Sequence, residues 1–367
     1  MNRVKLKDIA DIQAGPFGTQ LHKSEYVDNG IFMINAKNIG SSTILEDSAD
    51  YIPPTVIERL PRYLINEGDI LFGRAGSIER HTYIDKEYDG TFQGTNCIRI
   101  RCHDKSISKY ISYYLWLKNV KASIENNTGG SVQAYISSAL LKDITVLLPD
   151  TDTIQKVTSI LDKLDKKIKV NKAINDNLLA MSRASYLHSF FGKKENAKIS
   201  DILQENQKSS IQVSDAKGIQ GIYPFFTSGV TIYEWSEYLV KGKNIYLNTG
   251  GNADVKYYVG KSAYSTDTWC ISAKNDFTDY LFLLLDSIKP ELNQKFFQGT
   301  GLKHLQKPLI KDRKIYLPSP EELNAFNSNV SQMLEQISMN TRENQKLAGL
   351  RDWLLPLVMN GQVTIED

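Results

Sequence analysis

The stretch LKDITVLLPDTDTIQKV, from Leu141 to Val157, recurs in outline as IKDRKIYLPSPEELNAF, from Ile310 to Phe326. Each copy has a short hydrophobic run typical of a strand, then Leu-Pro, and then a sequence typical of the start of a helix. The copies are 169 residues apart, and without any gap the pairs that match are Lys142 with Lys311, Leu148 with Leu317 and Gly192 with Gly361. A repeat of this kind predicts that one structural unit occurs twice.

The sequence upstream of each copy repeats more loosely. VKLKDI (Val4–Ile9) resembles AKISDI (Ala197–Ile202), and GDILFGRAGS (Gly68–Ser77) resembles GKNIYLNTGG (Gly242–Gly251). Both halves combine strand-like runs rich in Val, Ile, Tyr and Phe, broken by Gly and Asn, with one apolar helix-like stretch. We therefore expect a mixed α+β fold with two tandem α/β domains, residues 1–150 and 196–318, and two long helical segments, residues 151–195 and 319–367.

Each helical segment carries a heptad pattern of apolar residues that includes two asparagines. The core positions that this pattern predicts are Ile154, Val157, Leu161, Leu164, Ile168, Asn171, Asn175 and Leu178 in the first segment and Leu323, Phe326, Val330, Met333, Ile337, Asn340, Asn344 and Leu347 in the second. About 40 residues at 1.5 Å each make a rod of roughly 60 Å, longer than one compact domain can cover. We therefore expect the helices to form an antiparallel coiled coil with approximate twofold symmetry, although an amphipathic helix packed on its own domain shows a similar stripe.

The two helical segments have opposite charge. Residues 151–195 carry 9 Lys+Arg against 5 Asp+Glu, and residues 319–367 carry 3 against 7. The lysines Lys166, Lys167, Lys169 and Lys172 can then face Glu335 and Glu343, whereas identical helices from two chains would repel each other. Asparagines at core positions lower the stability of a coiled coil but penalise slipped registers. Charge and asparagines together favour pairing within one chain in one register.

Composition and motifs argue against several classes of protein. The net charge is +2, the three cysteines form no C-x-x-C pair, and the five histidines lack metal-ligand spacing. The sequence has no phosphate-binding GxxxxGK[ST], no HExxH, no GxSxG and no base-methyltransferase motif. It also has no secretory h-region and no apolar run long enough to span a bilayer. We therefore expect a cytoplasmic protein with no catalytic residue, no metal site and no membrane contact.

Polar loops interleaved with basic and aromatic residues occur in both halves. Arg, Lys, Gln and Asn side chains can bond the edges of purines, and Ser and Thr can bind phosphate. The candidate DNA-binding residues in these loops are Thr19, Gln20, Lys23, Arg74, Ser77, Arg80, His81, Gln93, Gln133, Thr227, Ser228, Asn248, Asn252, Lys256, Lys303 and His304. Any single loop of this kind could instead simply connect two strands.

The order and duplication of these segments carry a family resemblance. GDILFGRAGS, followed by TGGSVQAYISSALLKDITVLLP and a long helix, with the whole unit repeated, resembles the specificity subunit of a type I restriction-modification system. The resemblance covers essentially the whole chain. One common pattern in that family has Glu-Gln at the helix start, where this chain has Asp152-Thr153-Ile154 and Glu321-Glu322-Leu323.

The resemblance implies a DNA-recognition subunit that is not itself an enzyme. Each target recognition domain would bind one half of a bipartite target in double-stranded DNA. The helices would set the spacer between the halves and dock two methyltransferase subunits. Those partners would bind S-adenosylmethionine and flip the target base, and restriction subunits that use ATP and Mg²⁺ are further partners in the family. This chain itself would bind no cofactor.

Two other functions stay open on the sequence alone. The chain could be an interaction scaffold whose two domains bind protein, or, less in keeping with the missing motifs, a DNA methyltransferase or nuclease of unrecognised type. Methyl transfer from S-adenosylmethionine by the pure chain would indicate an enzyme. Specific retention of bipartite DNA by a complex with a methyltransferase would exclude the scaffold.

Overall fold

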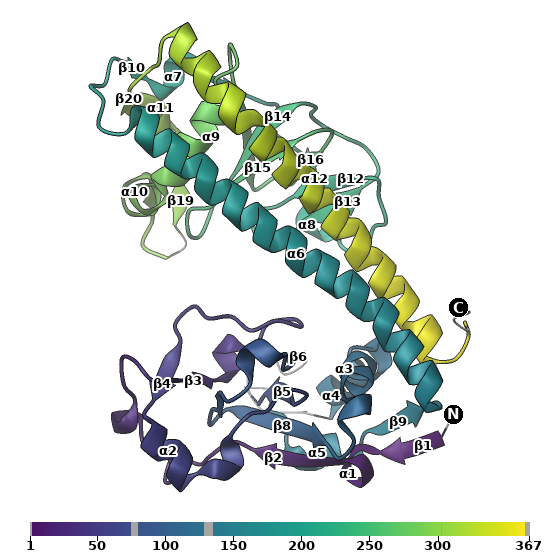
Figure 1. Ribbon diagram of the computed structural model, residues 1–367. Coiled ribbons are helices and arrows are strands. Elements are labelled where there is room, and N and C mark those ends of the chain that lie inside the picture. Colours follow the sequence, from purple (N-terminus) through teal and green to yellow (C-terminus); the bar gives the residue numbers. More distant parts are fainter. Residues whose placement is uncertain (1, 75–79, 128–134, 302, 364–367) are drawn as a thin grey trace. The chain divides into compact units, whose positions relative to one another are not determined.

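The computed structural model describes residues 2–74, 80–127, 135–301 and 303–363 (Figure 1). Contacts divide the chain into two units, Met1–Asp165 with Gly349–Asp367, and Lys166–Ala348. Each unit contains one domain with small β-sheets and part of both long helices. The predicted mixed α+β fold with two tandem domains and two long helices is confirmed.

The domain of the first unit is built on two small sheets. The four-stranded antiparallel sheet has the order β2 (Ala10–Ala14), β8 (Cys97–Cys102), β5 (Ile70–Gly73) and β6 (His81–Tyr83). The three-stranded sheet has the order β4 (Asp50–Ile52), β3 (Ile31–Ile34) and β7 (Phe92–Gln93), and β3 is parallel to β7. Helices α3 (Ser108–Leu115) and α4 (Lys118–Asn126) pack on the larger sheet, where Tyr110 and Phe72 are fully buried.

The domain of the second unit repeats this strand order. Its four-stranded sheet has the order β11 (Leu203–Glu205), β17 (Thr268–Ala273), β14 (Lys243–Asn248) and β15 (Val255–Val259). Its three-stranded sheet has the order β13 (Tyr233–Trp235), β12 (Tyr223–Phe226) and β16 (Ala263–Tyr264), with β12 parallel to β16. Helix α9 (Thr278–Ser287) takes the place of α3. The loose repetition in the sequence therefore corresponds to a repeated topology.

Each domain is closed by a strand pair that joins its beginning to its end. In the first unit β1 (Asn2–Lys5) pairs with β9 (Thr145–Leu148), and in the second β10 (Ala197–Lys198) pairs with β20 (Lys314–Ile315). The Lys5 Nζ lies 2.9 Å from the Asp143 carboxylate, and Lys198 forms the same ion pair with Asp312. The repeated Lys-Asp of the sequence thus supplies one partner of a repeated ion pair.

The remaining α-helices and strands are short and connect these sheets. They are α1 (Leu6–Ile9), α2 (Pro54–Arg59) and α5 (Ser138–Asp143) in the first unit, and α7 (Ile199–Ile202), α8 (Val213–Ala216), α10 (Lys289–Glu291), β18 (Phe297–Gln298), β19 (His304–Leu305) and α11 (Lys307–Asp312) in the second.

The two long helices are α6 (Thr151–Phe190) and α12 (Pro320–Met359), each of 40 residues. Both begin directly after the Leu-Pro of the repeat. The Asp150 carboxylate accepts hydrogen bonds from the amide and the hydroxyl of Thr153, both at 2.9 Å. At the second joint the Glu322 carboxylate accepts from the Ser319 amide at 2.9 Å, and the Ser319 hydroxyl accepts from the Glu322 amide at 3.3 Å. A side-chain cap therefore starts each helix, by a different residue in each copy.

The helices run antiparallel in the second unit, where Figure 1 shows α12 alongside α6. The Asn171 amide donates to the Asn344 side-chain oxygen at 2.9 Å, and the Asn340 amide donates to that of Asn175 at 2.8 Å. Later residues of α6 thus pair with earlier residues of α12. In the first unit the Arg351 guanidinium of α12 donates to Asp165 of α6 at 2.8 Å.

None of the sixteen predicted core positions is exposed. The buried members are Ile154, Val157, Leu161, Asn171, Leu323, Phe326, Val330 and Asn340, and the half-buried members are Leu164, Ile168, Asn175, Leu178, Met333, Ile337, Asn344 and Leu347. The first apolar residues of each helix also pack on the core of its own domain. The first turns of each helix therefore contact the domain as well as the partner helix.

Both helices form hydrogen bonds with the domain of the second unit. Arg183 of α6 donates from Nε to the buried carboxylate of Asp286 at 2.8 Å. Arg342 of α12 donates to Glu234 of β13 at 2.8 Å, and the amide of Val259 donates to Ser338 of α12 at 3.0 Å. The position of this domain on the helix pair is therefore fixed by polar contacts from both helices.

Replacing Asn171 alone is expected to cost more than replacing it together with Asn344. Asn171→Leu leaves the Asn344 amide in the helix interface without its partner and lowers the free energy of unfolding by about 1–3 kcal/mol. The double change to leucine removes both polar groups and recovers much of that loss. Urea unfolding followed by circular dichroism measures the three variants, with exposed Lys172→Ala as control. Strictly additive losses would contradict the coupling.

The cap at the start of α12 contains an ionisable carboxylate, that of Glu322. Hydrogen bonds from Lys193, Tyr316 and the Ser319 amide lower the pKa of Glu322 to about 2, below the roughly 4.3 of a glutamate in an unfolded chain. Because the folded-state pKa is the lower one, this stabilisation is complete above about pH 4.3 and is lost as the pH falls toward 2. E322Q should therefore lower the melting temperature at pH 7, and the gap to the wild type should close in acid. E335Q, on an exposed position of the same helix, is the control. An equal deficit at both ends of the pH range would contradict the assignment.

Candidate nucleic-acid interface

Four loops of the second unit meet around Asp267. The Asp267 carbonyl accepts a hydrogen bond from the Ser228 hydroxyl and another, at 2.8 Å, from the Thr249 hydroxyl. The Gly251 amide donates to the Lys303 carbonyl at 2.9 Å. The loops that follow β12, β14, β16 and β18 are therefore joined to one another. The structure thus brings together loops that the sequence marks as candidates at separate places.

Four loops also meet in the first unit. A Cβ placed on Gly15 would lie only 2.0 Å from the carbonyl oxygen of Gly94, so the backbones of two loops touch there. The Arg74 amide donates to the Asn96 carbonyl at 2.9 Å. The Arg74 guanidinium lies 4.6 Å from the centre of the Tyr135 ring, a cation–π distance. Each unit therefore gathers, within itself, a cluster of loops that are far apart in sequence.

The candidate DNA-binding residues fall into three groups in this structure. The exposed ones are Thr19, Lys23, Arg80, Asn252 and His304, the half-buried ones are Gln20, Arg74, Ser228, Lys256 and Lys303, and the buried ones are His81, Gln93, Thr227 and Asn248. Ser77 and Gln133 lie outside the described residues.

Two of the candidate DNA-binding residues, His81 and Gln93, are buried inside the domain. The fully buried His81 ring stacks between Phe72 and Trp116, with ring centres 4.7 and 4.3 Å away. The Gln93 amide donates to the Gln13 carbonyl at 2.9 Å. Both side chains therefore make their contacts inside the domain.

Asn248 and Thr227 are also buried. The Asn248 amide donates to the Gly250 carbonyl at 2.8 Å, and its side-chain oxygen accepts from the Asp254 amide at 2.7 Å. The Thr227 hydroxyl donates to the Thr231 carbonyl at 3.1 Å. These short polar side chains satisfy the backbone of their own loops, as Asn and Thr commonly do in turns.

Lys256 also serves a loop. Its Nζ donates to the carbonyls of Thr227 at 2.8 Å and Gly229 at 2.6 Å. Burial lowers the pKa of Lys256, and the nearby Asp254 carboxylate opposes that shift. Lys256 is therefore a brace for the loop that contains Thr227 and Gly229.

Exposed apolar residues in the loops are a feature that the sequence analysis missed. Val230 is 93% exposed and Phe17 is 64% exposed. Both stand in otherwise polar loops that the structure joins to their neighbours. The signal in the sequence was an apolar residue inside a stretch of Gly, Ser and Thr, which a search for hydrogen-bonding side chains passes over.

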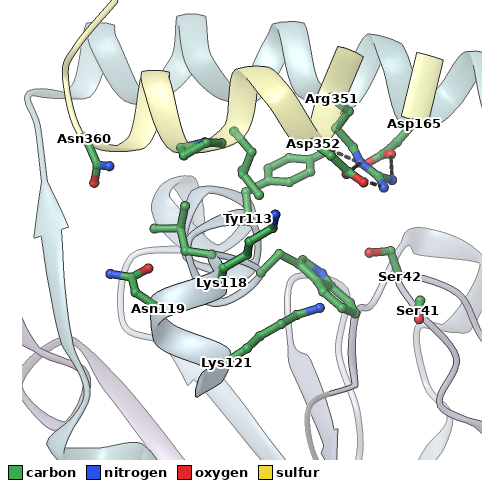
Figure 2. Close-up of a pocket in the computed structure, with 14 residues that line it drawn as sticks. Ser41, Ser42, Tyr113, Lys118, Asn119, Lys121, Asp165, Arg351, Asp352 and Asn360 are labelled. Carbon is green, nitrogen blue, oxygen red and sulfur yellow. Dashed lines mark hydrogen bonds and ion pairs between the residues drawn. The ribbon is translucent and has the colours of Figure 1, made fainter. Parts of the chain in front are cut away.

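A cavity of about 570 Å³ lies in the first unit where α3, α4, α6 and α12 meet (Figure 2). On one side the Tyr113 hydroxyl donates to the Asp165 carboxylate at 2.8 Å, and Arg351 donates to both Asp165 and Asp352 at 2.8 Å. Lys118 and Lys121 line another side. The Asp165 and Asp352 carboxylates are thus both paired with Arg351. Through Tyr113, Asp165 and Arg351, hydrogen bonds join α3 of the domain to α6 and α12.

Within the described ranges no group of three or more His, Cys, Asp or Glu side chains could hold a metal ion. In that part of the chain no helix combines the length and the apolar character that crossing a membrane would need.

Both loop clusters lie in parts of the chain that match a known protein family. A family model described as the type I restriction modification DNA specificity domain matches residues 1–180 and 192–349. The chain belongs to this family. The two matched segments show that the specificity domain occurs twice in tandem, and the two loop clusters lie in successive copies of it.

Known relatives agree with this assignment. The specificity subunit of the type I restriction enzyme MjaIX from Methanocaldococcus jannaschii is 22% identical over an alignment of 410 residues, covering 99% of this chain and 93% of that protein. The MjaVIII specificity subunit of the same organism is 22% identical over 174 residues, which are 46% of this chain and 40% of that protein. The solved structure of a type I restriction-modification S subunit from M. genitalium matches over 97% of this chain and 95% of its own, with 14% identity and a TM-score of 0.60. The fold is therefore shared with that S subunit.

Gly15→Ala is expected to disturb the loop cluster of the first domain, whereas Gly18→Ala in the same loop should be neutral. The new methyl group of G15A would overlap the Gly94 carbonyl, while a Cβ on Gly18 has no atom within 4 Å. Overlap of this size should lower the free energy of unfolding by about 1–3 kcal/mol. Thermal unfolding of the two variants measures the difference. Equal melting temperatures would show that the close approach of the two loops is not required.

Proposed function

We propose that this chain supplies the sequence specificity of a type I restriction-modification enzyme by binding a bipartite site in double-stranded DNA. The observation that carries the proposal is the gathering of four loops in each unit of a chain that has two tandem DNA specificity domains. The loops can differ between the copies while the sheets behind them stay alike. Each unit would then bind one half-site.

The two long helices are proposed to set the spacing between the half-sites. Both α6 and α12 continue without interruption across the boundary between the units. Forty residues at 1.5 Å each give a rod of roughly 60 Å, enough to span at least one turn of DNA, about 34 Å. The paired asparagines give the helices one preferred register, so the spacing would not vary between molecules.

A face of α6 in the second unit supports docking of a partner on the helices. Val170, Ile174 and Met181 are 52%, 40% and 54% exposed, and their spacing puts them on one side of the helix. Exposed apolar residues that share a face are typical of protein interfaces. We propose that the helices dock two methyltransferase subunits, which hold S-adenosylmethionine, and that restriction subunits using ATP and Mg²⁺ join this complex.

The charge of the chain fits a division of labour among subunits. Protein–DNA affinity depends strongly on the number of phosphates that Lys and Arg neutralise. A net charge of +2 over 367 residues gives little of this effect. We propose that this chain selects the sequence without catalysing a step, and that its partners supply much of the contact with the DNA backbone.

The test lengthens both helices by one heptad, inserted between Asp165 and Lys166 in α6 and between Ala348 and Gly349 in α12. These points lie at the boundary of the units, so the contacts inside each unit are kept. Seven residues add about 10 Å, or roughly three base pairs. Mapping of methylated adenines produced by the complex with its methyltransferase should show unchanged half-sites and a spacer longer by about three base pairs.

The control carries the same seven residues at the exposed turn of Gly218, where they should leave the spacer unchanged. A spacer unaffected by the two heptads would contradict the role of the helices. Absence of any bipartite methylated motif with the wild-type chain would contradict the proposed function as a whole.

A further inference from the structure

The loop between β12 and β13 of the second unit contains one highly solvent-exposed apolar side chain, that of Val230. Val230 is 93% exposed, the highest exposure among the large hydrophobic residues that the structure describes. A single exposed valine is ordinary on a protein surface. What distinguishes Val230 is how firmly its loop is held and which other loops surround it.

Hydrogen bonds fix this loop on both sides of Val230. The Lys256 ammonium donates to the carbonyls of Thr227 and Gly229, on the N-terminal side of Val230, at 2.8 and 2.6 Å. The Thr227 hydroxyl accepts from the Gly229 amide at 3.1 Å and donates to the Thr231 carbonyl, on the other side of Val230, at 3.1 Å. The conformation of the loop is therefore fixed before any ligand binds, which lowers the entropy cost of binding.

The same loop belongs to the cluster proposed to bind DNA. Ser228 donates to the Asp267 carbonyl, which also accepts from Thr249 in the next loop. Exposed polar residues of neighbouring loops, Asn252 and His304, offer hydrogen bonds to a ligand. Val230 is thus an apolar contact among polar ones, and such a surface matches the mixture of groups on the edges of base pairs.

We propose that Val230 contacts the 5-methyl group of a thymine in the half-site bound by the second unit, and that Lys256 is the positioning residue for this contact. The inference rests on the proposed function. In the major groove, thymine presents a methyl group that the other three bases lack, and small apolar side chains recognise it. The residues that open base steps by insertion are larger ones such as Phe, Leu, Ile and Met, so contact with a methyl group suits valine better.

The experiment uses the full chain in complex with its methyltransferase. Selection from random duplexes first gives the bipartite motif of the wild-type complex. Each thymine of the half-site bound by the second unit is then replaced by deoxyuridine, which lacks only the methyl group. Replacement of the one thymine that contacts Val230 should weaken DNA binding by the wild-type complex about fourfold, which is the effect of one buried methyl group. V230A should bind the thymine and deoxyuridine duplexes equally.

Two matched variants complete the test. Ile222 is 65% exposed in the same unit, but its carbonyl is bonded by Arg342 of α12, so it lies toward the helices. I222A should keep the full preference for thymine. K256M keeps the valine side chain but removes the two hydrogen bonds that position its loop, so it should reduce the preference for thymine over deoxyuridine.

The outcomes separate this inference from the proposed function. A wild-type complex that selects a bipartite motif but shows no position sensitive to deoxyuridine overturns the inference alone. Retention of the full preference by V230A also overturns it. A wild-type complex that selects no motif overturns the proposed function and the inference together.

Discussion

Paired asparagine side chains inside an antiparallel helix interface are the constraint on which the second unit depends. A slip of one heptad would place the Asn171 amide opposite Ile337 instead of Asn344, and an amide without a partner costs about 1–3 kcal/mol. Apolar residues alone would tolerate such a slip more readily. The register matters because α6 and α12 both bond the same recognition domain, through Arg183 and through Ser338 and Arg342. Only one register satisfies the amides and both sets of contacts.

The two copies of the joint between strand and helix solve the same problem with different residues. In one copy Asp150 caps the helix, and in the other Ser319 and Glu322 form a reciprocal cap. In both, the first apolar residues of the helix pack on the domain that precedes them. The first turns of each helix thus pack on their own domain and on the end of the partner helix together. What the repeat preserves is a physical role, and the residue type that fills it varies.

The architecture could be predicted from the sequence because it depends on periodicity and order. The heptad positions and the duplicated Leu-Pro required no knowledge of the tertiary structure. The functional surface was harder to predict, because a polar side chain in a loop can bond either a ligand or its own backbone. His81, Gln93 and Asn248 make their contacts inside the protein. The His81 ring stacks between two aromatic rings, and the side-chain amides of Gln93 and Asn248 donate to backbone carbonyls. Val230 escaped notice for the converse reason, because only the folded loop shows that this apolar side chain stays in water.

The closing strand pairs have a consequence for how such proteins change over time. Because β1 pairs with β9, Asn2 lies opposite Leu148, and because β10 pairs with β20, Ala197 lies opposite Ile315. The chain therefore enters and leaves each recognition domain at neighbouring points. A recombination event that exchanges everything between these points would replace one domain as a cassette and leave both helices and their caps intact. A new DNA specificity could then arise in a single genetic step, without any need to evolve the rest of the protein again.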